Sequence, residues 1–371
     1  MRILIINVTC GFGSTGRICT DIADELIEQN HDVMIAYGRG NVPNRFSSRS
    51  IRIGSQFRTR VNALMCRLFD NDGFASKKQT RKFLKWAETY NPDIVWLHNL
   101  HGYYINVPLL FNWLKGRAST QIKWTLHDCW AFTGHCCYFD FVGCKKWTNG
   151  CYECPAKREY PKSILADCSR ENYLKKKGAF TGLKNMTIIT PSFWLAGLVK
   201  QSFLKEYDVT VVNNKIDRSI FKPTANDFRR VYGLEDKKIV LGVASPWSER
   251  KGLKDFVLLS AMLDNTYSIV LVGLSKKQIK ELPNSILGFE RTNSLIELAK
   301  IYSSADVFVN TTYEDNYPTV NLESQACGTP CITYDTGGSI ESVPPQNVVE
   351  KGNIQMLALR IKEICEAKKY D

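Results

Sequence analysis

Short apolar runs alternate with helical patterns along the whole chain, and this alternation constrains the fold more than any other feature of the sequence. Strands that alternate with helices pack as parallel sheets with helices on their faces, so the fold class is α/β. One helical segment is 17–29, where Ile18, Ile22 and Leu26 recur every four residues and define one buried face. The expected strands are 2–8, 33–37, 93–98, 121–127, 187–190, 209–213, 239–244, 268–273, 306–310 and 331–334.

The length of 371 residues predicts two domains, because a single hydrophobic core rarely grows beyond about 250 to 300 residues. The segment 211–217 is typical of the start of a second domain. We expect an N-terminal domain over residues 1–205 and a C-terminal domain over residues 206–371. Residues 128–170 are rich in Cys, Gly, Trp and charge, and we interpret them as an irregular insertion in the first domain.

A glycine loop follows the first strand, where Gly11, Gly13 and Gly16 have the spacing G-x-G-x-x-G directly before a helix. Small residues there let the backbone approach an anionic ligand at the helix N-terminus. A dinucleotide enzyme also needs an acid at the end of the second strand, where this sequence has Arg39, so only an NADP-dependent oxidoreductase remains of that class. The alternatives are a tight turn without a ligand and a loop that borders a ligand cleft, with Gly13 facing the ligand.

Two carboxylates, Asp315 and Glu323, stand eight positions apart after an apolar strand. Pro318 between them suits the first turn of a helix. A helix that starts there directs its free backbone amides at the preceding loop, where a diphosphate binds favourably. We therefore expect Tyr317, Pro318 and Thr319 to border a diphosphate site and the two acids to contact sugar hydroxyls. An acidic loop on a solvated surface is the alternative.

The segment 313–330, which ends in Cys-Gly-Thr-Pro, resembles the signature of glycosyltransferase family 4, in which two acids stand eight positions apart. Asp315 takes the place of the commoner glutamate, and Glu314 is an alternative for the working acid. The glycine pair at 337–338 and the segment 214–217 resemble two further elements of that family, so the resemblance covers nearly the whole chain. It implies a GT-B fold, in which two Rossmann-like parallel-sheet domains face each other across a cleft. The N-terminal domain would bind the acceptor and the C-terminal domain the nucleotide-sugar donor.

The resemblance also implies a reaction, the retaining transfer of a hexose-type sugar from a UDP- or GDP-linked donor to a glycan or lipid-linked acceptor. Asp315 would contact the transferred sugar and Glu323 the ribose. Arg250 and Lys251 lie in a turn that resembles the family's phosphate-binding turn, and fixed cations there lower the barrier because negative charge develops on the leaving diphosphate. An exposed basic turn is the alternative. No Asp-x-Asp of the kind that holds a divalent metal in other glycosyltransferases precedes the candidate donor site, so we expect catalysis that requires no metal or other cofactor.

His127 ends the strand 121–127, at the edge of a parallel sheet where ligands usually bind. In family 4 a histidine at the matching position contacts the transferred sugar or the acceptor, and the resemblance assigns that role to His127. Structural hydrogen bonding is the alternative. His98 and His101 end the preceding strand, and they either line the acceptor side or serve the structure.

Four cysteines of the insertion, Cys136, Cys144, Cys151 and Cys154, have the spacing C-x7-C-x6-C-x2-C. Thiolates at such spacing can bind a structural zinc, for which the C-x2-C pair supplies a tight chelate. Free buried thiols and disulfides are the alternatives. This stretch also resembles the subgroup of family 4 that is associated with bacterial surface polysaccharides of the colanic acid and O-antigen type.

The formal charge of +12 predicts an anionic partner. Basic residues gather among apolar ones at 58–85, which is typical of basic amphipathic helices that either cover a core or contact anionic lipid. The first residues lack the pattern of a signal peptide, and no apolar stretch is long enough to cross a bilayer. We expect a cytoplasmic protein in peripheral contact with the inner face of the cytoplasmic membrane. A zinc-containing nucleic-acid-binding protein is the remaining alternative; two Rossmann-like domains speak against it and against a nucleic-acid partner.

Overall fold

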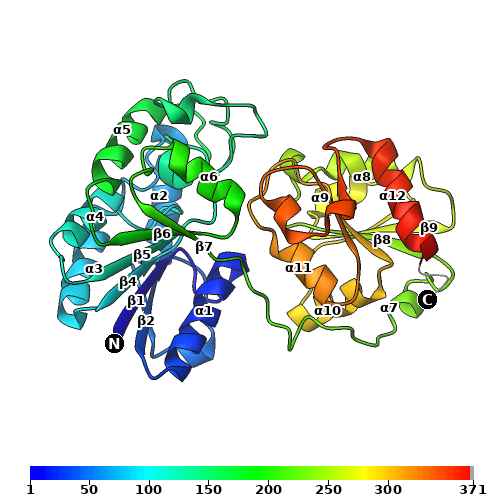
Figure 1. The fold of residues 1–371 in the computed structure, drawn as a ribbon, viewed down its shortest axis with the longest axis horizontal. Helices are drawn as coiled ribbons and strands as arrows, with labels where there is room; N and C mark the ends of the chain where they lie inside the picture. Colours follow the sequence, from blue (N-terminus) through cyan, green and yellow to red (C-terminus); the bar gives the residue numbers. More distant parts are fainter. Residues whose placement is uncertain (368–371) are drawn as a thin grey trace. The chain divides into compact units, whose positions relative to one another are not determined.

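The computed structural model describes residues 1–367 and divides into two compact units, with the boundary between Asn213 and Asn214 (Figure 1). Each unit is built around one parallel β-sheet with helices on its faces, which confirms the predicted α/β class. None of the helices in the described residues combines the length and the apolar character needed to span a membrane.

The first unit contains a seven-stranded sheet in the order β3-β2-β1-β4-β5-β6-β7, in which all neighbouring strands are parallel. The central strand β1 is buried on both faces, as a parallel sheet covered on both sides requires. The strands are β1 (Arg2–Asn7), β2 (Asp32–Tyr37), β3 (Ser50–Arg52), β4 (Ile94–Leu97), β5 (Gln121–Thr125), β6 (Met186–Thr190) and β7 (Asp208–Val211). The helices are α1 (Gly13–Glu28), α2 (Gln56–Phe69), α3 (Lys77–Tyr90), α4 (Val107–Lys115), α5 (Ser169–Phe180) and α6 (Phe193–Gln201), with 3-10 turns η1 (Asn44–Phe46), η2 (Trp130–Phe132) and η3 (Lys146–Thr148).

The second unit contains a six-stranded parallel sheet in the order β10-β9-β8-β11-β12-β13. Its strands are β8 (Lys238–Val243), β9 (Tyr267–Val272), β10 (Ile286–Phe289), β11 (Val307–Asn310), β12 (Cys331–Tyr334) and β13 (Val348–Val349). Its helices are α7 (Phe228–Val231), α8 (Leu253–Ser260), α9 (Lys276–Glu281), α10 (Leu295–Ser304), α11 (Thr319–Ala326) and α12 (Ile354–Ala367), with 3-10 turns η4 (Glu249–Lys251), η5 (Ser339–Ser342) and η6 (Pro345–Asn347).

All ten predicted strands are present, and three further strands were not predicted. These three, β3, β10 and β13, lie at the edges of the two sheets and have only 3, 4 and 2 residues. An edge strand is covered by fewer neighbours and needs no long apolar run, so its sequence carries little signal.

The predicted face of α1 faces the core but is not its most buried part. Ile18, Ile22 and Leu26 are partly buried, and Ile22 and Leu26 pack against a hydrophobic core cluster of the first unit. The fully buried positions are Gly16, Cys19, Thr20 and Ala23. These small side chains let the helix lie close to the sheet, while the larger apolar residues flank the contact.

The boundary between the units falls eight residues later than the expected one at 205 and 206. Strand β7 pairs in parallel with β6 and closes one edge of the first sheet. Its residues therefore belong to the first unit, and the second unit begins at Asn214.

Candidate functional site

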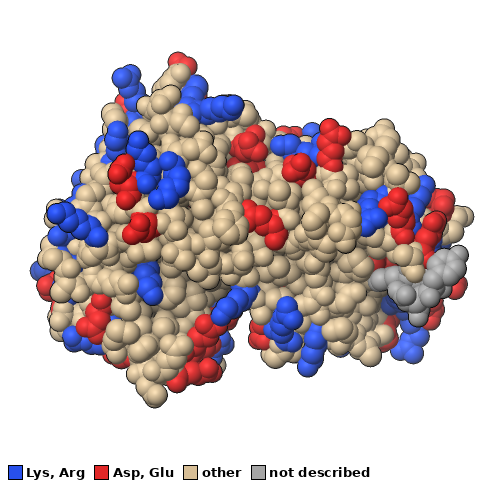
Figure 2. Space-filling view, viewed as in Figure 1, with Lys and Arg blue, Asp and Glu red and all other residues tan. Residues whose placement is uncertain are grey.

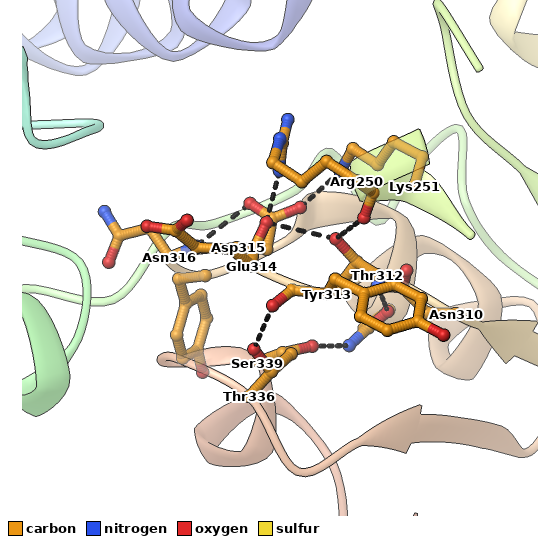
Figure 3. Close-up of polar contacts among 12 residues, drawn as sticks. Arg250, Lys251, Asn310, Thr312, Tyr313, Glu314, Asp315, Asn316, Thr336 and Ser339 are labelled. Carbon is orange, nitrogen blue, oxygen red and sulfur yellow. Dashed lines mark hydrogen bonds and ion pairs between the residues drawn. The ribbon is translucent and has the colours of Figure 1, made fainter. Parts of the chain in front are cut away.

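The candidate site of the second unit lies at the carboxyl edge of its sheet, where the loop after β11 meets the turn after β8. Thr311 Oγ1 donates to the carbonyl oxygens of Lys251 (3.0 Å) and Gly252 (3.1 Å), and Tyr313 N donates to Arg250 O (2.7 Å). These bonds hold the basic turn η4 against the acidic loop. Figure 3 shows Arg250 and Lys251 of the turn beside Thr312, Glu314 and Asp315 of the loop. The edge of the sheet is where ligands bind in open α/β folds.

Gly252 makes this close approach of two backbones possible. Its φ is +71°, and a Cβ at this position would lie 2.2 Å from the carbonyl oxygen of Thr311. Any other residue would therefore push the basic turn away from the loop.

Lys251 and Asp315, which the sequence predicted on separate motifs, form an ion pair through Nζ and Oδ2 (Figure 3). Burial raises the pKa of Asp315, but the positive charges of Lys251 and Arg250 outweigh it and hold that pKa below the ordinary value. Burial lowers the pKa of Lys251, and Asp315 opposes this shift. Asp315 is therefore ionised at neutral pH, and its carboxylate favours the charged form of Lys251.

Arg250 Nη1 donates to the backbone carbonyl of Glu314. Its contact with a diphosphate stays a prediction. The Glu314 side chain is fully buried, whereas the Asp315 side chain is 13% exposed. Of the two neighbouring acids, Asp315 is thus the one that reaches both a cation and solvent.

The glycine pair after β12 fixes the acidic loop from the other side. Gly338 N donates to Asp315 O over 3.1 Å, and a Cβ on Gly337 would lie 2.2 Å from the same oxygen. The φ of Gly337 is +52°, which L side chains rarely adopt. Thr336 Oγ1 adds a bond of 2.7 Å to Tyr313 O. The loop around Asp315 is held by its backbone and not only by its ion pair.

A buried polar network behind this loop was missed by the sequence reasoning. Asn310, the last residue of β11, donates to Asn321 Oδ1 over 2.8 Å, and Asn321 Nδ2 donates to Ser342 Oγ (2.9 Å) and Ser339 Oγ (3.3 Å). Thr333 Oγ1 lies 2.7 Å from Ser339 Oγ. The network joins β11, α11, β12 and η5, and its only sequence signal was polar residues at positions where apolar ones are usual.

Helix α11 begins at Thr319 with Pro318 as its N-cap residue, which confirms the predicted start. Asn214 Nδ2 donates to Tyr317 O over 2.9 Å and so ties the first residue of the unit to the loop before the helix. The N-terminus of α11 therefore follows directly on the segment that holds Asp315.

Glu323 lies on the second turn of α11 and is almost completely buried. Its Oε2 accepts a bond of 3.2 Å from the hydroxyl of the buried Tyr302. The structure thus brings together the ion pair and the start of α11, with Glu323 one turn deeper.

In the first unit, Gly13 opens α1 with a φ of +69° and has no atom within 4 Å of its would-be Cβ. Gly11 and Gly16 differ, because a Cβ there would lie 2.4 Å from Pro43 Cγ and 2.6 Å from Thr9 Oγ1. The two outer glycines are needed for packing, and the middle one is the exposed member of the loop.

His127 follows β5, and its Nε2 lies 3.0 Å from Nδ1 of His98, which follows β4. The two rings stack with centroids 5.3 Å apart. Burial lowers the pKa of His127 to about 4, a shift that Asp128 opposes and His101 reinforces. Burial also lowers the pKa of His98. Both imidazoles are neutral at pH 7.

His101 is held by two partners, Tyr160 Oη at 3.1 Å from Nδ1 and Asp128 Oδ2 at 2.8 Å from Nε2. Cys137 completes a group in which one ligand atom from each of His101, Asp128 and Cys137 lies within 4.8 Å of the others. This is the one such group of His, Cys, Asp and Glu within residues 1–367. Because both ring nitrogens already have hydrogen-bond partners, the group is satisfied without an ion.

The four cysteines of the predicted zinc motif lie in the irregular segment after β5 as free thiols, with Cys136 buried and the other three partly buried. Whether they bind zinc stays a prediction.

Residues 224–371 match a family model described as Glycosyl transferases group 1. The chain is similar to an Escherichia coli K12 protein described as "Putative colanic acid biosynthesis glycosyl transferase WcaC", with 24% identity over 382 aligned positions that cover 99% of this chain and 92% of the relative.

Solved structures share the fold at low sequence identity. Sucrose-phosphate synthase from Thermosynechococcus elongatus superposes with a TM-score of 0.72 at 17% identity, covering 99% of this chain and 90% of the other. Alr3699/HepE from Anabaena in complex with UDP gives a TM-score of 0.67 at 15% identity, with 99% and 91% coverage, and has also been solved in complex with UDP-glucose. These neighbours confirm the predicted GT-B fold class.

Proposed function

Because residues 224–371 form a domain of the group 1 glycosyl transferases, we propose that the protein transfers a hexose-type sugar, with retention, from a nucleoside diphosphate sugar to a surface glycan or its lipid-linked precursor. The observation that carries this proposal is the cluster of Lys251, Asp315 and the α11 N-terminus at one edge of the second sheet. A cation, a carboxylate and free helix amides in one place suit a sugar joined to a diphosphate.

The chemistry follows from where charge develops. As the bond between the anomeric carbon and the diphosphate breaks, negative charge grows on the leaving phosphate oxygens. The Lys251 ammonium and the backbone amides at Thr319 and Val320 stabilise that charge more in the transition state than in the ground state, which lowers the barrier. Arg250 would leave the Glu314 carbonyl to add a second cation. With these groups the leaving diphosphate needs no metal.

Asp315 is proposed as the acid that orients the transferred sugar, because it is ionised and partly exposed while Glu314 is buried. Its oxygens accept hydrogen bonds from sugar hydroxyls, and its pairing with Lys251 keeps the sugar beside the diphosphate. Glu323, one turn along α11, is proposed to accept from the ribose hydroxyls. Tyr302 then serves to fix the Glu323 carboxylate.

His127 and Gly13 are proposed as contacts of the first unit with the bound donor or acceptor. A neutral His127 can donate or accept a hydrogen bond with a sugar hydroxyl without placing a positive charge near the anomeric carbon. The open position of Gly13 leaves room for a ligand against the start of α1.

A UDP-linked donor is favoured by the Anabaena neighbour, whose structures hold UDP and UDP-glucose. A surface-polysaccharide acceptor is favoured by the full-length similarity to the Escherichia coli colanic acid protein. A GDP-linked donor is the alternative, and thermal shift with UDP and with GDP distinguishes the two.

Peripheral binding to an anionic membrane is proposed from the surface of the first unit. Helix α2 exposes Phe57, Leu64 and Phe69 beside exposed arginines. The loop 164–166 runs along its end, through Ile164 N to Arg67 O (2.7 Å), and adds the exposed Leu165. Figure 2 shows Lys and Arg side chains on the face of this unit that α5 covers in Figure 1. Apolar side chains ringed by cations suit the interface of an anionic bilayer.

The membrane contact is tested by co-sedimentation with vesicles of phosphatidylglycerol and with vesicles of phosphatidylcholine alone. We expect binding to the first and not the second, and a loss of about ten-fold in the double variant Leu64→Gln, Leu165→Gln. Leu258→Gln, an equally exposed leucine of the second unit, is the matched control. Equal binding to both vesicle types would exclude an anionic lipid surface.

The transferase proposal is tested by thermal shift with UDP, GDP, ADP, UDP-glucose and NADPH, because a ligand of the native state raises Tm in proportion to its affinity. Stabilisation by one nucleoside diphosphate and its sugar conjugate names the donor base. The anomeric configuration of the product, read from proton coupling constants, then tests retention. Stabilisation by NADPH alone would replace the proposal with an NADP-dependent oxidoreductase.

A further inference from the structure

The segment after β5 is packed although it has almost no regular structure. Between residues 129 and 168 it contains only the short turns η2 and η3. Its core is a cluster of three aromatic rings, Phe132, Phe139 and Trp147. Seven of the thirteen cysteines of the chain lie in this range, and all seven are free thiols. An irregular segment of this length usually needs a cross-link or a metal to hold one conformation.

Four of these sulfurs form a chain of neighbours. The thiols of Cys136 and Cys154 are joined by a hydrogen bond, Cys151 lies within electrostatic reach of both, and Cys144 lies within reach of Cys151. Gly134 N donates to Cys151 Sγ over 3.1 Å. The N–H of Ala156 donates to the sulfur of Cys154. Two backbone N–H groups thus point at sulfurs of this cluster.

Gly134 marks how closely the chain approaches this cluster. A Cβ at Gly134 would lie 2.7 Å from Cys151 Cβ and 2.0 Å from the carbonyl oxygen of Ser169. Only glycine lets the backbone N–H reach the Cys151 sulfur.

His135, beside this glycine, supplies an independent observation. Its side chain has no exposed surface, and its Nδ1 is bound to Asp70 Oδ1 over 2.5 Å. Asp70 is itself fixed by Cys168 N, which donates to its Oδ2 over 2.9 Å. The other ring nitrogen, Nε2, is buried without a hydrogen-bond partner. Cys154 is the sulfur within its electrostatic reach. A buried polar atom without a partner costs stability unless a bound group satisfies it.

Lys176 is a second buried charged group near these sulfurs. It is 1% exposed, donates to the Trp130 carbonyl (2.8 Å) and lies over the Trp130 ring. Asp72 is its main charge partner, and Cys136 and Cys151 also lie within its electrostatic reach. A buried ammonium is stabilised when an anion lies nearby.

We propose that Cys136, Cys144, Cys151 and Cys154 bind one structural zinc ion as thiolates, and that His135, oriented by Asp70, donates its Nε2–H to the Cys154 sulfur. Zinc with four thiolates carries two negative charges, of which the Lys176 ammonium offsets one. The site is separate from the proposed transferase chemistry and stands whether or not that proposal holds.

Metal binding would tighten the segment. Within residues 1–367 no three of the proposed ligand atoms lie within 4.8 Å of one another. Cys144, Cys151 and Cys154 are partly exposed and lie in loops around η3, so they can draw together on the buried Cys136. Binding energy and folding of the segment are then coupled, as in other structural zinc sites.

The first experiment measures the metal content of the full-length protein, purified under reducing conditions, by elemental mass spectrometry. We expect about one zinc per chain. After exchange with cobalt, intense charge-transfer and visible bands of a tetrahedral thiolate site should appear. This measurement needs no variant, so a folding defect cannot obscure it. Zinc near zero with no cobalt bands would overturn the proposal, as would an intact mass that shows disulfides.

Variants then test the ligands. Cys151→Ser and Cys144→Ser should lose the metal, and Cys168→Ser, a partly buried cysteine of the same region, should keep it. His135→Phe should keep the metal with an affinity about 10- to 100-fold lower, measured by competition with a chelator. If Cys137→Ser loses the metal while Cys151→Ser keeps it, the ion is bound by the His101, Asp128 and Cys137 group and the assignment is wrong.

Discussion

Two pairs of titratable side chains lie at the carboxyl edges of the two sheets. The pair in the first unit is neutral, and the pair in the second unit is an ion pair. In the first unit His98 and His127 are both neutral, because burial dominates their pKa values. In the second unit Asp315 is ionised and forms an ion pair with Lys251, because the two nearby cations outweigh the burial of the carboxylate. The carboxyl edge of a parallel sheet can therefore hold either neutral hydrogen-bonding groups or charged groups. The charges of neighbouring side chains determine which of the two is present.

The difference suits two parts of one reaction. Charge is needed where the diphosphate leaves, and a neutral donor or acceptor is needed where sugar hydroxyls are recognised. The loop around Asp315 is also held by backbone contacts from η4 and from Gly338, whereas His127 contacts a side chain, the ring of His98.

The largest expected effect comes from removing the positive charge of the second pair. Lys251→Ala should lower kcat/KM by about 10²- to 10³-fold, since one fixed group that meets developing negative charge contributes on that order. The loss should lie mainly in kcat. Lys254→Ala is the matched control, because Lys254 pairs with Glu249 on the same turn but is 80% exposed. Equal losses in the two variants would show that Lys251 has no special role.

A second change breaks the backbone support of the charged pair and leaves its side chains in place. Gly337→Ala adds a Cβ 2.2 Å from Asp315 O at a φ of +52°. We expect a loss of roughly 2–3 kcal/mol in the unfolding free energy of the second unit.

Gly233→Ala is the control for Gly337→Ala, because Gly233 has a similar φ of +63° but no atom within 4 Å. It should cost about 1 kcal/mol. Urea unfolding of both variants separates the backbone strain from the clash, and a Gly337→Ala no less stable than Gly233→Ala would contradict the role of the close contact.

The strands and site residues that could be predicted from the sequence are those with a local sequence pattern. The ten main strands follow from apolar runs, and Lys251, Asp315 and the start of α11 follow from short motifs that each resemble a family element. Their pairing in space then follows from the topology of a parallel sheet, whose carboxyl ends share one edge.

The rest depends on partners that are distant in sequence and ordinary in type. Nothing near Asn310 indicates that Asn321 and Ser339 complete its network, and nothing near Glu323 indicates that Tyr302 binds it. The neutral state of His127 likewise comes from burial and from His98, 29 residues earlier. Long-range burial is a property of the folded chain, and no local motif encodes it.

The third prediction uses pH to separate the two pairs. His127 titrates at about 4 when folded and at its ordinary value of 6.5 when unfolded, so the unfolded state binds more protons between these values. Stability of the first unit is therefore complete above about pH 6.5 and falls as the pH is lowered toward 4. The unfolding free energy of the first unit should fall by roughly 2 kcal/mol less between pH 7 and pH 5 in His127→Gln than in the unchanged protein.

Hydrogen exchange resolves the pH response of each unit, with peptides of β5 reporting on the first and peptides of β11 on the second. The Asp315 carboxylate has a pKa below its ordinary value of 3.8. Its contribution to stability is therefore lost only as the pH falls below about that value, and Asp315→Asn should not alter the response of β11 between pH 7 and pH 5. A parallel loss in β5 and β11 would mean that the two pairs do not differ as proposed.

The smallest expected effect concerns the support of Glu323. Tyr302→Phe removes a buried hydroxyl that donates to Oε2 over 3.2 Å and leaves the ring packing intact. A hydrogen bond to a carboxylate contributes on the order of 1–2 kcal/mol, so the Kd of the stabilising nucleoside diphosphate should rise by about 5- to 30-fold. Tyr267→Phe, a partly exposed tyrosine of the same unit, should leave that Kd unchanged. If Tyr302→Phe lowers Tm but leaves the Kd unchanged, Glu323 is a core residue and the ribose contact must be sought elsewhere on α11.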